Sequence, residues 1–173
     1  MAKISESTAV LLIDMQKTFL DYISEQMREP LINTQRMVID YCAARDVPLV
    51  VLEYAPRCYG RTNDKLSRAA KMVPRNTFVE KKSQSGFNDT NLEQVLHDFG
   101  RKNLYLMGIY TDQCVQKTAE DALKKNFKIT ISQDVTSCVG NGDKINLDWF
   151  KDSGVYTDTY IEMIWIMEGF ILR

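Results

Sequence analysis

Stretches of continuous apolar residues alternate along this chain with stretches in which apolar and polar residues are mixed. The continuous stretches predict five β-strands, at residues 8–14, 47–54, 76–81, 103–109 and 127–134. Residues 154–158 predict a weaker sixth strand. Because continuous apolar runs are typical of parallel strands that are covered on both faces, we expect a mostly parallel sheet.

The mixed stretches predict helices at about residues 30–45, 90–100 and 112–126. In the last of these, the apolar residues fall on one helical face, and they are Val115, Ala119, Ala122 and Leu123. Strand and helix signals alternate throughout, without a repeat, a low-complexity tract or a linker. We therefore expect a single α/β domain of residues 1–173.

The C-terminal tail, residues 160–173, is apolar on nearly all sides. Such a segment is either a packed helix or a contact between copies of the chain, and we expect a homo-oligomer.

The amino-acid composition limits the partners and the location that we expect for the protein. The 173 residues carry 22 basic and 23 acidic side chains, so we expect neither a nucleic acid nor a membrane surface as partner, but a small-molecule substrate. The four cysteines are scattered, without a CxxC pair, and are interpreted as reduced thiols. The first apolar run is too short for a signal peptide or a membrane span, so a cytoplasmic location is expected.

Three polar residues stand where a parallel sheet binds its ligands, at the carboxyl ends of strands. Asp14 ends the first strand, Lys81 ends the third, and Cys114 opens the helix after the fourth. Each also has an ordinary structural interpretation, as a turn residue, a solvated lysine and a buried core thiol. Together they can supply a thiol nucleophile, a proton acceptor and a cation.

The position of Cys114 in a first helical turn, capped by Thr111 or Asp112, predicts a lowered thiol pKa, because the free N–H groups favour an anion. The only histidine, His97, lies on the helix at 90–100, away from the strand ends, and is interpreted as structural or solvated.

Three motifs in order resemble the isochorismatase-like cysteine hydrolase superfamily, which includes nicotinamidases, carbamoyl-amide hydrolases and isochorismatases. They are AVLLIDMQKTF with Asp14, EKKSQSGFNDTNLEQVL with Lys81, and GIYTDQCVQKTAEDALKKNFKITISQDVTS with Cys114. The choice of Lys81 over Lys82 follows from the four-residue step to Ser85 in the family pattern. The resemblance covers residues 8 to about 136.

The resemblance implies a three-layer α/β/α sandwich with a Rossmann-like central sheet, and a catalytic triad of Asp14, Lys81 and Cys114. Cys114 would attack an amide or carbamoyl carbon to form a thioester, with Asp14 moving the proton and Lys81 holding Asp14. It also implies a cis peptide at Ile109–Tyr110 and an oxyanion hole made by the N–H groups of Tyr110 and Cys114.

The chain departs from the family in ways that bear on the substrate. Related nicotinamidases have an Asp-x-His pair after the second strand that binds a metal, whereas this chain has EYAPRCYGR and no histidine there. We therefore expect no metal and no cofactor. The expected substrate contacts are Phe19, Tyr54, Arg57, Tyr59, Phe87 and Tyr110, with Arg61 a further arginine that could pair with a substrate carboxylate.

Three functions remain open at this point. The first is a cysteine amidohydrolase that acts on a small amide. The second is an isochorismatase-type ether hydrolase, in which Asp14 supplies the proton and Cys114 is incidental. The third is an inactive protein that binds a small molecule. The presence of all three polar residues argues against this third function.

Overall fold

The computed structural model describes residues 7–140 and 147–170, and its core is a six-stranded, all-parallel sheet in the order β3-β2-β1-β4-β5-β6. The strands are β1 (Thr8–Ile13), β2 (Leu49–Tyr54), β3 (Asn76–Lys81), β4 (Asn103–Ile109), β5 (Lys128–Ser137) and β6 (Val155–Thr157). All six predicted strands are therefore present, and the predicted parallel sheet is confirmed.

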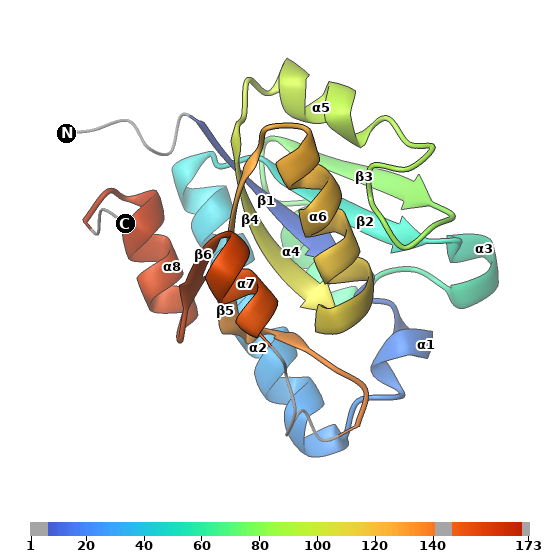
Figure 1. Ribbon diagram of the computed structural model, residues 1–173. Helices are drawn as coiled ribbons and strands as arrows, with labels where there is room; N and C mark the ends of the chain where they lie inside the picture. Colours follow the sequence, from blue (N-terminus) through green and yellow to red (C-terminus); the bar gives the residue numbers. More distant parts are fainter. Residues whose placement is uncertain (1–6, 141–146, 171–173) are drawn as a thin grey trace.

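Helices cover both faces of the sheet (Figure 1). They are α1 (Lys17–Leu20), α2 (Glu25–Arg45), α3 (Pro56–Tyr59), α4 (Asp64–Ala70), α5 (Leu92–Asp98), the π-helical turn η2 (Thr111–Val115), α6 (Gln116–Lys124), α7 (Asp148–Ser153) and α8 (Tyr160–Met167). Side chains of α2, α4 and α8 pack into one hydrophobic cluster, and those of α5, α6 and α7 pack into the other. The α/β fold class is confirmed.

The central strand β1 shows why apolar residues follow one another without interruption in the predicted strands. All six of its residues are buried, and successive side chains point to opposite faces. Val10 and Leu12 enter the cluster beneath α2, whereas Leu11 and Ile13 enter the cluster beneath α6. A strand with two covered faces has no position at which a polar residue would meet water.

Two helix predictions need correction. Helix α2 begins at Glu25 rather than near residue 30, and Pro30 lies inside it on the exposed side. The helix predicted at 112–126 is broken, because Gln113 has non-helical dihedrals (φ −127°, ψ −106°), so that the regular helix α6 begins only at Gln116. The short helices α1, α3, α4 and α7 had no clear sequence signal.

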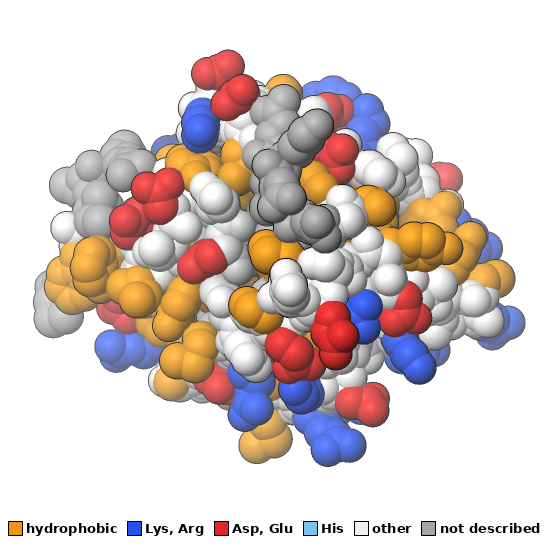
Figure 2. Space-filling model, turned by 90° about the horizontal axis from the view of Figure 1, so that it is seen from below, with side chains coloured by type: hydrophobic (Ala, Val, Ile, Leu, Met, Phe, Trp, Pro, Cys, Tyr) orange, Lys and Arg blue, Asp and Glu red, His pale blue; other side chains and the backbone are white. Residues whose placement is uncertain are grey.

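The tail forms helix α8, which packs through Met163 and Met167. Ile161 and Trp165 on this helix and Phe170 beyond it are exposed. Figure 2 shows hydrophobic side chains gathered at its left, the side on which Figure 1 draws α8. The packed helix is confirmed, the homo-oligomer stays a prediction, and residues 171–173 lie outside the described part. Within the described ranges, no helix is long and apolar enough to cross a membrane.

Gly108, near the end of β4, allows this strand to lie against β1, where it pairs with Ile13. Its φ of +136° lies in a region that other residues rarely adopt, and a Cβ at this position would overlap the backbone of Ile13. We expect Gly108→Ala to lower the free energy of unfolding by about 3 kcal/mol or more, measured by urea denaturation.

Gly100 provides the matched control, because it also has a positive φ (+66°) but has open space where its Cβ would be. Gly100→Ala should cost only about 1 kcal/mol. Equal losses in the two variants would contradict the close approach of β4 to β1.

Candidate active site

The three predicted polar residues lie at the carboxyl edge of the sheet. Asp14 follows β1, with a positive φ of 53°, and its N–H donates to the Leu52 carbonyl of the neighbouring strand β2 at 3.0 Å. Lys81 is the last residue of β3. Cys114 lies in the turn η2, between β4 and α6.

Asp14 and Lys81 form a buried ion pair. Lys81 Nζ lies 2.7 Å from Asp14 Oδ2, and the two side chains are 0% and 3% exposed, respectively. The ammonium group also donates to the carbonyl oxygens of Ser83 (3.0 Å) and Gln84 (3.2 Å), so the ion pair is supported by two hydrogen bonds to the backbone. The neighbouring Lys82 is exposed. The structure therefore places Lys81, and not Lys82, beside Asp14.

Burial dominates the titration of Asp14 and Cys114. It raises the pKa of the Asp14 carboxyl, although the charge of the neighbouring Lys81 opposes the rise. Burial, together with the charge of Asp14, raises the pKa of the Cys114 thiol to about 12, and Lys81 offsets this only in part. The Cys114 thiol is thus neutral near pH 7, and the Asp14 carboxyl beside it is paired with the Lys81 ammonium.

The expected lowering of the Cys114 pKa is contradicted, because burial of the thiol and the charge of Asp14 outweigh the effect of Lys81. The break at Gln113 precedes Cys114 and separates the two expected caps, Thr111 and Asp112, from the residues that lead into α6. Neither expected cap bonds to the helix: Thr111 Oγ1 pairs with Thr136 Oγ1 at 2.7 Å, and Asp112 Oδ1 accepts from Cys138 Sγ at 3.6 Å.

The turn that carries Cys114 begins with the cis peptide Ile109–Tyr110 expected from the resemblance. Thr136 on β5 donates to the Gly108 carbonyl at 2.9 Å, so its hydroxyl accepts from Thr111. The Tyr110 hydroxyl donates to the Phe19 carbonyl at 2.6 Å. The turn is therefore fastened both to the next strand and to α1.

A cavity of about 170 Å³ opens beside the Asp14 carboxylate and the Cys114 thiol. It is lined by Asp14, Phe19, Tyr54, Tyr59, Gln84, Ile109, Tyr110, Gln113 and Cys114. The structure thus brings four predicted substrate contacts to this cavity, namely Phe19, Tyr54, Tyr59 and Tyr110. Sequence reasoning missed Gln84 and Gln113, which belong to no polar pattern that distinguishes them from solvated glutamines.

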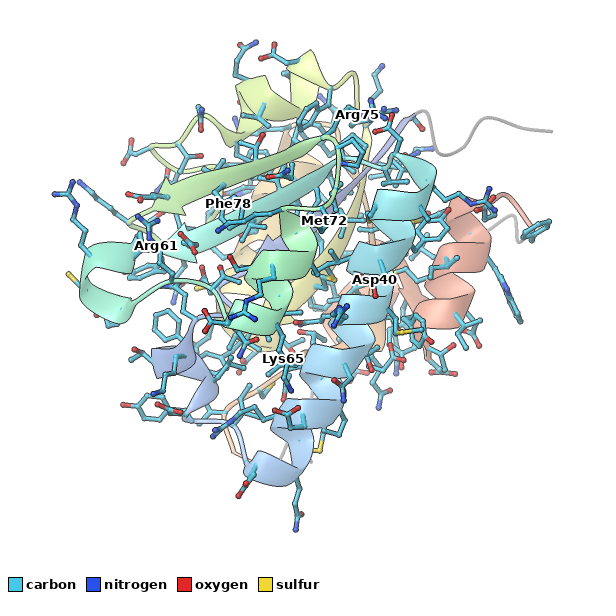
Figure 3. The ribbon with its side chains drawn as sticks, turned by 180° about the vertical axis from the view of Figure 1, so that it is seen from behind. Asp40, Arg61, Lys65, Met72, Arg75 and Phe78 are labelled. Carbon is cyan, nitrogen blue, oxygen red and sulfur yellow. The ribbon has the colours of Figure 1, made fainter. Side chains whose placement is uncertain are left out.

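The other expected contacts lie elsewhere, contrary to the sequence-based expectation. Arg57 lines a separate cavity of about 680 Å³. Phe87 is buried and packs against Phe127, with 5.7 Å between the ring centroids. Arg61 is paired with Glu53 (2.7 Å) and Glu80 (2.9 Å). Figure 3 shows Arg61 near the end of β3, where these partners hold it.

Metal ligands are scarce in the described ranges, 7–140 and 147–170, where no group of three or more His, Cys, Asp and Glu side chains could hold an ion. Glu53 is occupied, because its carboxylate accepts from the N–H and hydroxyl of Thr62 as well as from Arg61. The His97 side chain is 62% exposed and lies 3.8 Å from Glu93, which agrees with its solvated interpretation.

The comparisons with known proteins agree with the geometry. A family model described as "Isochorismatase domain" matches residues 8–145. The chain is similar to Nicotinamidase 3 of Arabidopsis thaliana, with 27% identity over 152 residues that cover 77% of this chain and 74% of the relative. It is also similar to isochorismatase family protein 2A of Dictyostelium discoideum, with 26% identity over 168 residues, or 92% and 83% of the two chains.

Among solved structures, a cysteine hydrolase from Pseudomonas syringae pv. phaseolicola superimposes with a TM-score of 0.74 at 19% identity. The match covers 95% of this chain and 94% of that one. At this identity, the likeness concerns the fold.

The raised thiol pKa makes a prediction about alkylation, because the thiolate and not the thiol is the nucleophile. In the free protein at pH 7, iodoacetamide should label the exposed Cys58 before Cys114. The Cys114 rate should rise about tenfold per pH unit up to about pH 9, since its pKa lies well above this range. Mass-mapped labelling measures both rates, and a Cys114 rate that levels off near neutrality would contradict the raised pKa.

Proposed function

The chain belongs to the isochorismatase family, and we propose that it is a cysteine-dependent hydrolase that cleaves the C–N bond of a small amide or carbamoyl compound. One observation carries the proposal. A buried carboxylate, Asp14, and a thiol, Cys114, line the same cavity, and the carboxylate is paired with a buried cation, Lys81.

The directions of the pKa shifts support a role for Asp14 as proton acceptor. A thiol with a pKa of about 12 does not ionise on its own at neutral pH, so its proton has to be taken as it attacks. Burial raises the pKa of Asp14, which makes this carboxylate a stronger base than an exposed one. Lys81 keeps the carboxylate in place and balances the charge that moves between Asp14 and Cys114.

The reaction then proceeds in two steps. Cys114 Sγ forms a bond to the carbonyl carbon while its proton passes to Asp14, and the developing oxyanion is stabilised by the N–H groups of Tyr110 and Cys114. The C–N bond breaks, and the amine or ammonia leaves with the proton from Asp14. Water then attacks the thioester, gives a proton to Asp14 and releases the acid, and the thiol recovers its proton.

The thiol distinguishes amide cleavage from ether cleavage. Ether hydrolysis in the isochorismatase manner needs a proton from Asp14 but no sulfur nucleophile. Cys114 lines the cavity together with Asp14, which favours acyl chemistry. The name of the Arabidopsis relative, a nicotinamidase, also points to amide hydrolysis. Ammonia release from a panel that contains nicotinamide, benzamide, acetamide and N-carbamoyl compounds tests the proposal.

Variants of the three residues should lose activity while they keep the fold. Asp14→Asn removes the proton acceptor, Lys81→Met removes the cation, and Cys114→Ala removes the nucleophile. Each should lower kcat/KM at least about a hundredfold on whichever panel amide is hydrolysed, with circular dichroism unchanged. Lys82→Met is the matched control and should stay within about twofold, because this lysine is exposed.

The outcome for Cys114→Ala also separates the alternatives. If the variant keeps its activity on a vinyl ether substrate, the ether-hydrolase interpretation replaces the amidase. If no amide or ether is turned over by the unmodified protein, a binding function without catalysis is the better account.

We predict that activity does not depend on a metal. The segment after β2 contains no histidine, and the buried carboxylate near the end of β2, Glu53, is already bound by Thr62 and Arg61. Transition metals are held by histidines, clustered thiolates or converging carboxylates, whereas this segment has one thiol, Cys58, and no group of three ligands among the described residues. Dialysis against a strong chelator should change kcat by less than about twofold. Stoichiometric zinc in elemental analysis, or activity restored only by added metal, would contradict this prediction.

A further inference from the structure

The aromatic side of the cavity is built from separate segments of the chain. Phe19 comes from α1, Tyr54 from the end of β2 and Tyr59 from α3. The ring centroids of Phe19 and Tyr59 are 5.1 Å apart, those of Tyr54 and Tyr59 5.7 Å, and those of Phe19 and Tyr54 6.1 Å. We call these three rings the aromatic wall. Its shape depends on how the three segments are held together.

The side chain of Gln16 holds two of these segments. Its Nε2 donates to the Tyr54 carbonyl at 3.0 Å and to the Gly60 carbonyl at 2.6 Å, and its Oε1 accepts from the Tyr54 N–H at 2.7 Å. Tyr54 is a wall residue, and Gly60 directly follows the wall residue Tyr59. Gln16 is 0% exposed, so water does not compete for these hydrogen bonds.

The backbone of Gln16 holds the third segment. Its carbonyl accepts from the N–H groups of Phe19 (3.1 Å) and Leu20 (3.0 Å), which begins the helical turn of α1. Its own N–H donates to the carbonyl of Asp14 at 2.7 Å. One buried residue therefore contacts all three segments of the wall and the residue proposed as proton acceptor.

We propose that Gln16 is a positioning residue that sets the affinity of the cavity for the flat, apolar part of a substrate. The consequence of this inference for catalysis rests on the proposed function. Both amide protons of Gln16 and one of its acceptor positions are used, which leaves the side chain a single orientation. Gln16 does not line the cavity, so it acts through Tyr54 and Tyr59 and not by contact with substrate.

The first test measures binding without turnover. In a Cys114→Ala background, the Kd of benzamide, whose ring fits the chemistry of the wall, is measured by saturation-transfer NMR. Gln16→Met keeps the length of the side chain but removes all three hydrogen bonds, and should raise this Kd at least about tenfold. Gln16→Glu keeps only the acceptor for the Tyr54 N–H and should raise the Kd as well, which provides a second variant if the first fails to fold.

Gln35→Met is the matched control. Gln35 is also 0% exposed, and its Nε2 donates to the Val135 carbonyl (2.9 Å) and to Met15 Sδ (3.3 Å), with no contact to the wall. The control makes the same change at equal burial and should alter the benzamide Kd by less than about twofold. An unchanged Kd in both Gln16 variants, equal losses in Gln16→Met and Gln35→Met, or no benzamide binding to the parent protein would overturn the proposal.

The second test uses the panel amide that is hydrolysed best among those with a ring. With Cys114 present, Gln16→Met should raise KM at least about tenfold and leave kcat within about threefold. A loss in kcat at constant KM would mean that Gln16 acts on the nucleophile instead, and would overturn the proposal. If no amide is hydrolysed, the proposed function fails, whereas the benzamide measurement still decides the role of Gln16.

Discussion

The buried ion pair between Asp14 and Lys81 is the interaction around which the site is built. Removing two charges from water costs several kcal/mol for each ion, and this cost is offset only by close geometry and further hydrogen bonds. Both conditions are met, with 2.7 Å between Nζ and Oδ2 and two carbonyl acceptors for the Lys81 ammonium. The pair also joins strands that are not neighbours, since β2 lies between β1 and β3.

Because Lys81 has to reach across the end of β2, it passes over the last residue of that strand. Its Nζ lies 4.7 Å from the centroid of the Tyr54 ring, a cation–π contact that adds to the stability of the buried ammonium. The same ring is part of the aromatic wall. The position of Tyr54 is thus fixed from one side by the ion pair and from the other by Gln16.

The parts of the structure that the sequence predicts well are those set by local chemistry. Two-sided burial leaves continuous apolar runs, so the strands were evident, and the strand ends then indicated Asp14 and Lys81. The break at Gln113 was not predictable, because hydroxyl pairing between Thr111 and Thr136 joins residues 25 positions apart and competes with the helix cap that the sequence suggests. The error in the pKa of Cys114 has another cause, because burial of the thiol and the charge of Asp14 depend on packing between distant segments.

The expected substrate contacts likewise depend partly on local sequence and partly on distant segments. Arg61 was a candidate because an arginine near a strand end can bind a carboxylate, but Glu53 and Glu80, brought beside it by the parallel pairing of β2 and β3, already neutralise it. The ring of Phe87 packs in the hydrophobic core with side chains of α5 and α6. Whether a charged or aromatic residue faces a ligand depends on partners from distant segments, which no local pattern reveals.

The segment that leaves β1 combines two tasks within a few residues. Asp14 ends the strand beside the thiol, and Gln16, two residues later, fastens the loop that carries Tyr54 and Tyr59. Its carbonyl then starts the turn that places Phe19. Because β1 is the central strand and is fully buried, this segment has little freedom to move. The proposed reacting groups and the surface that would receive the substrate are therefore positioned by the same rigid strand, so their spacing is fixed by the backbone between residues 14 and 19.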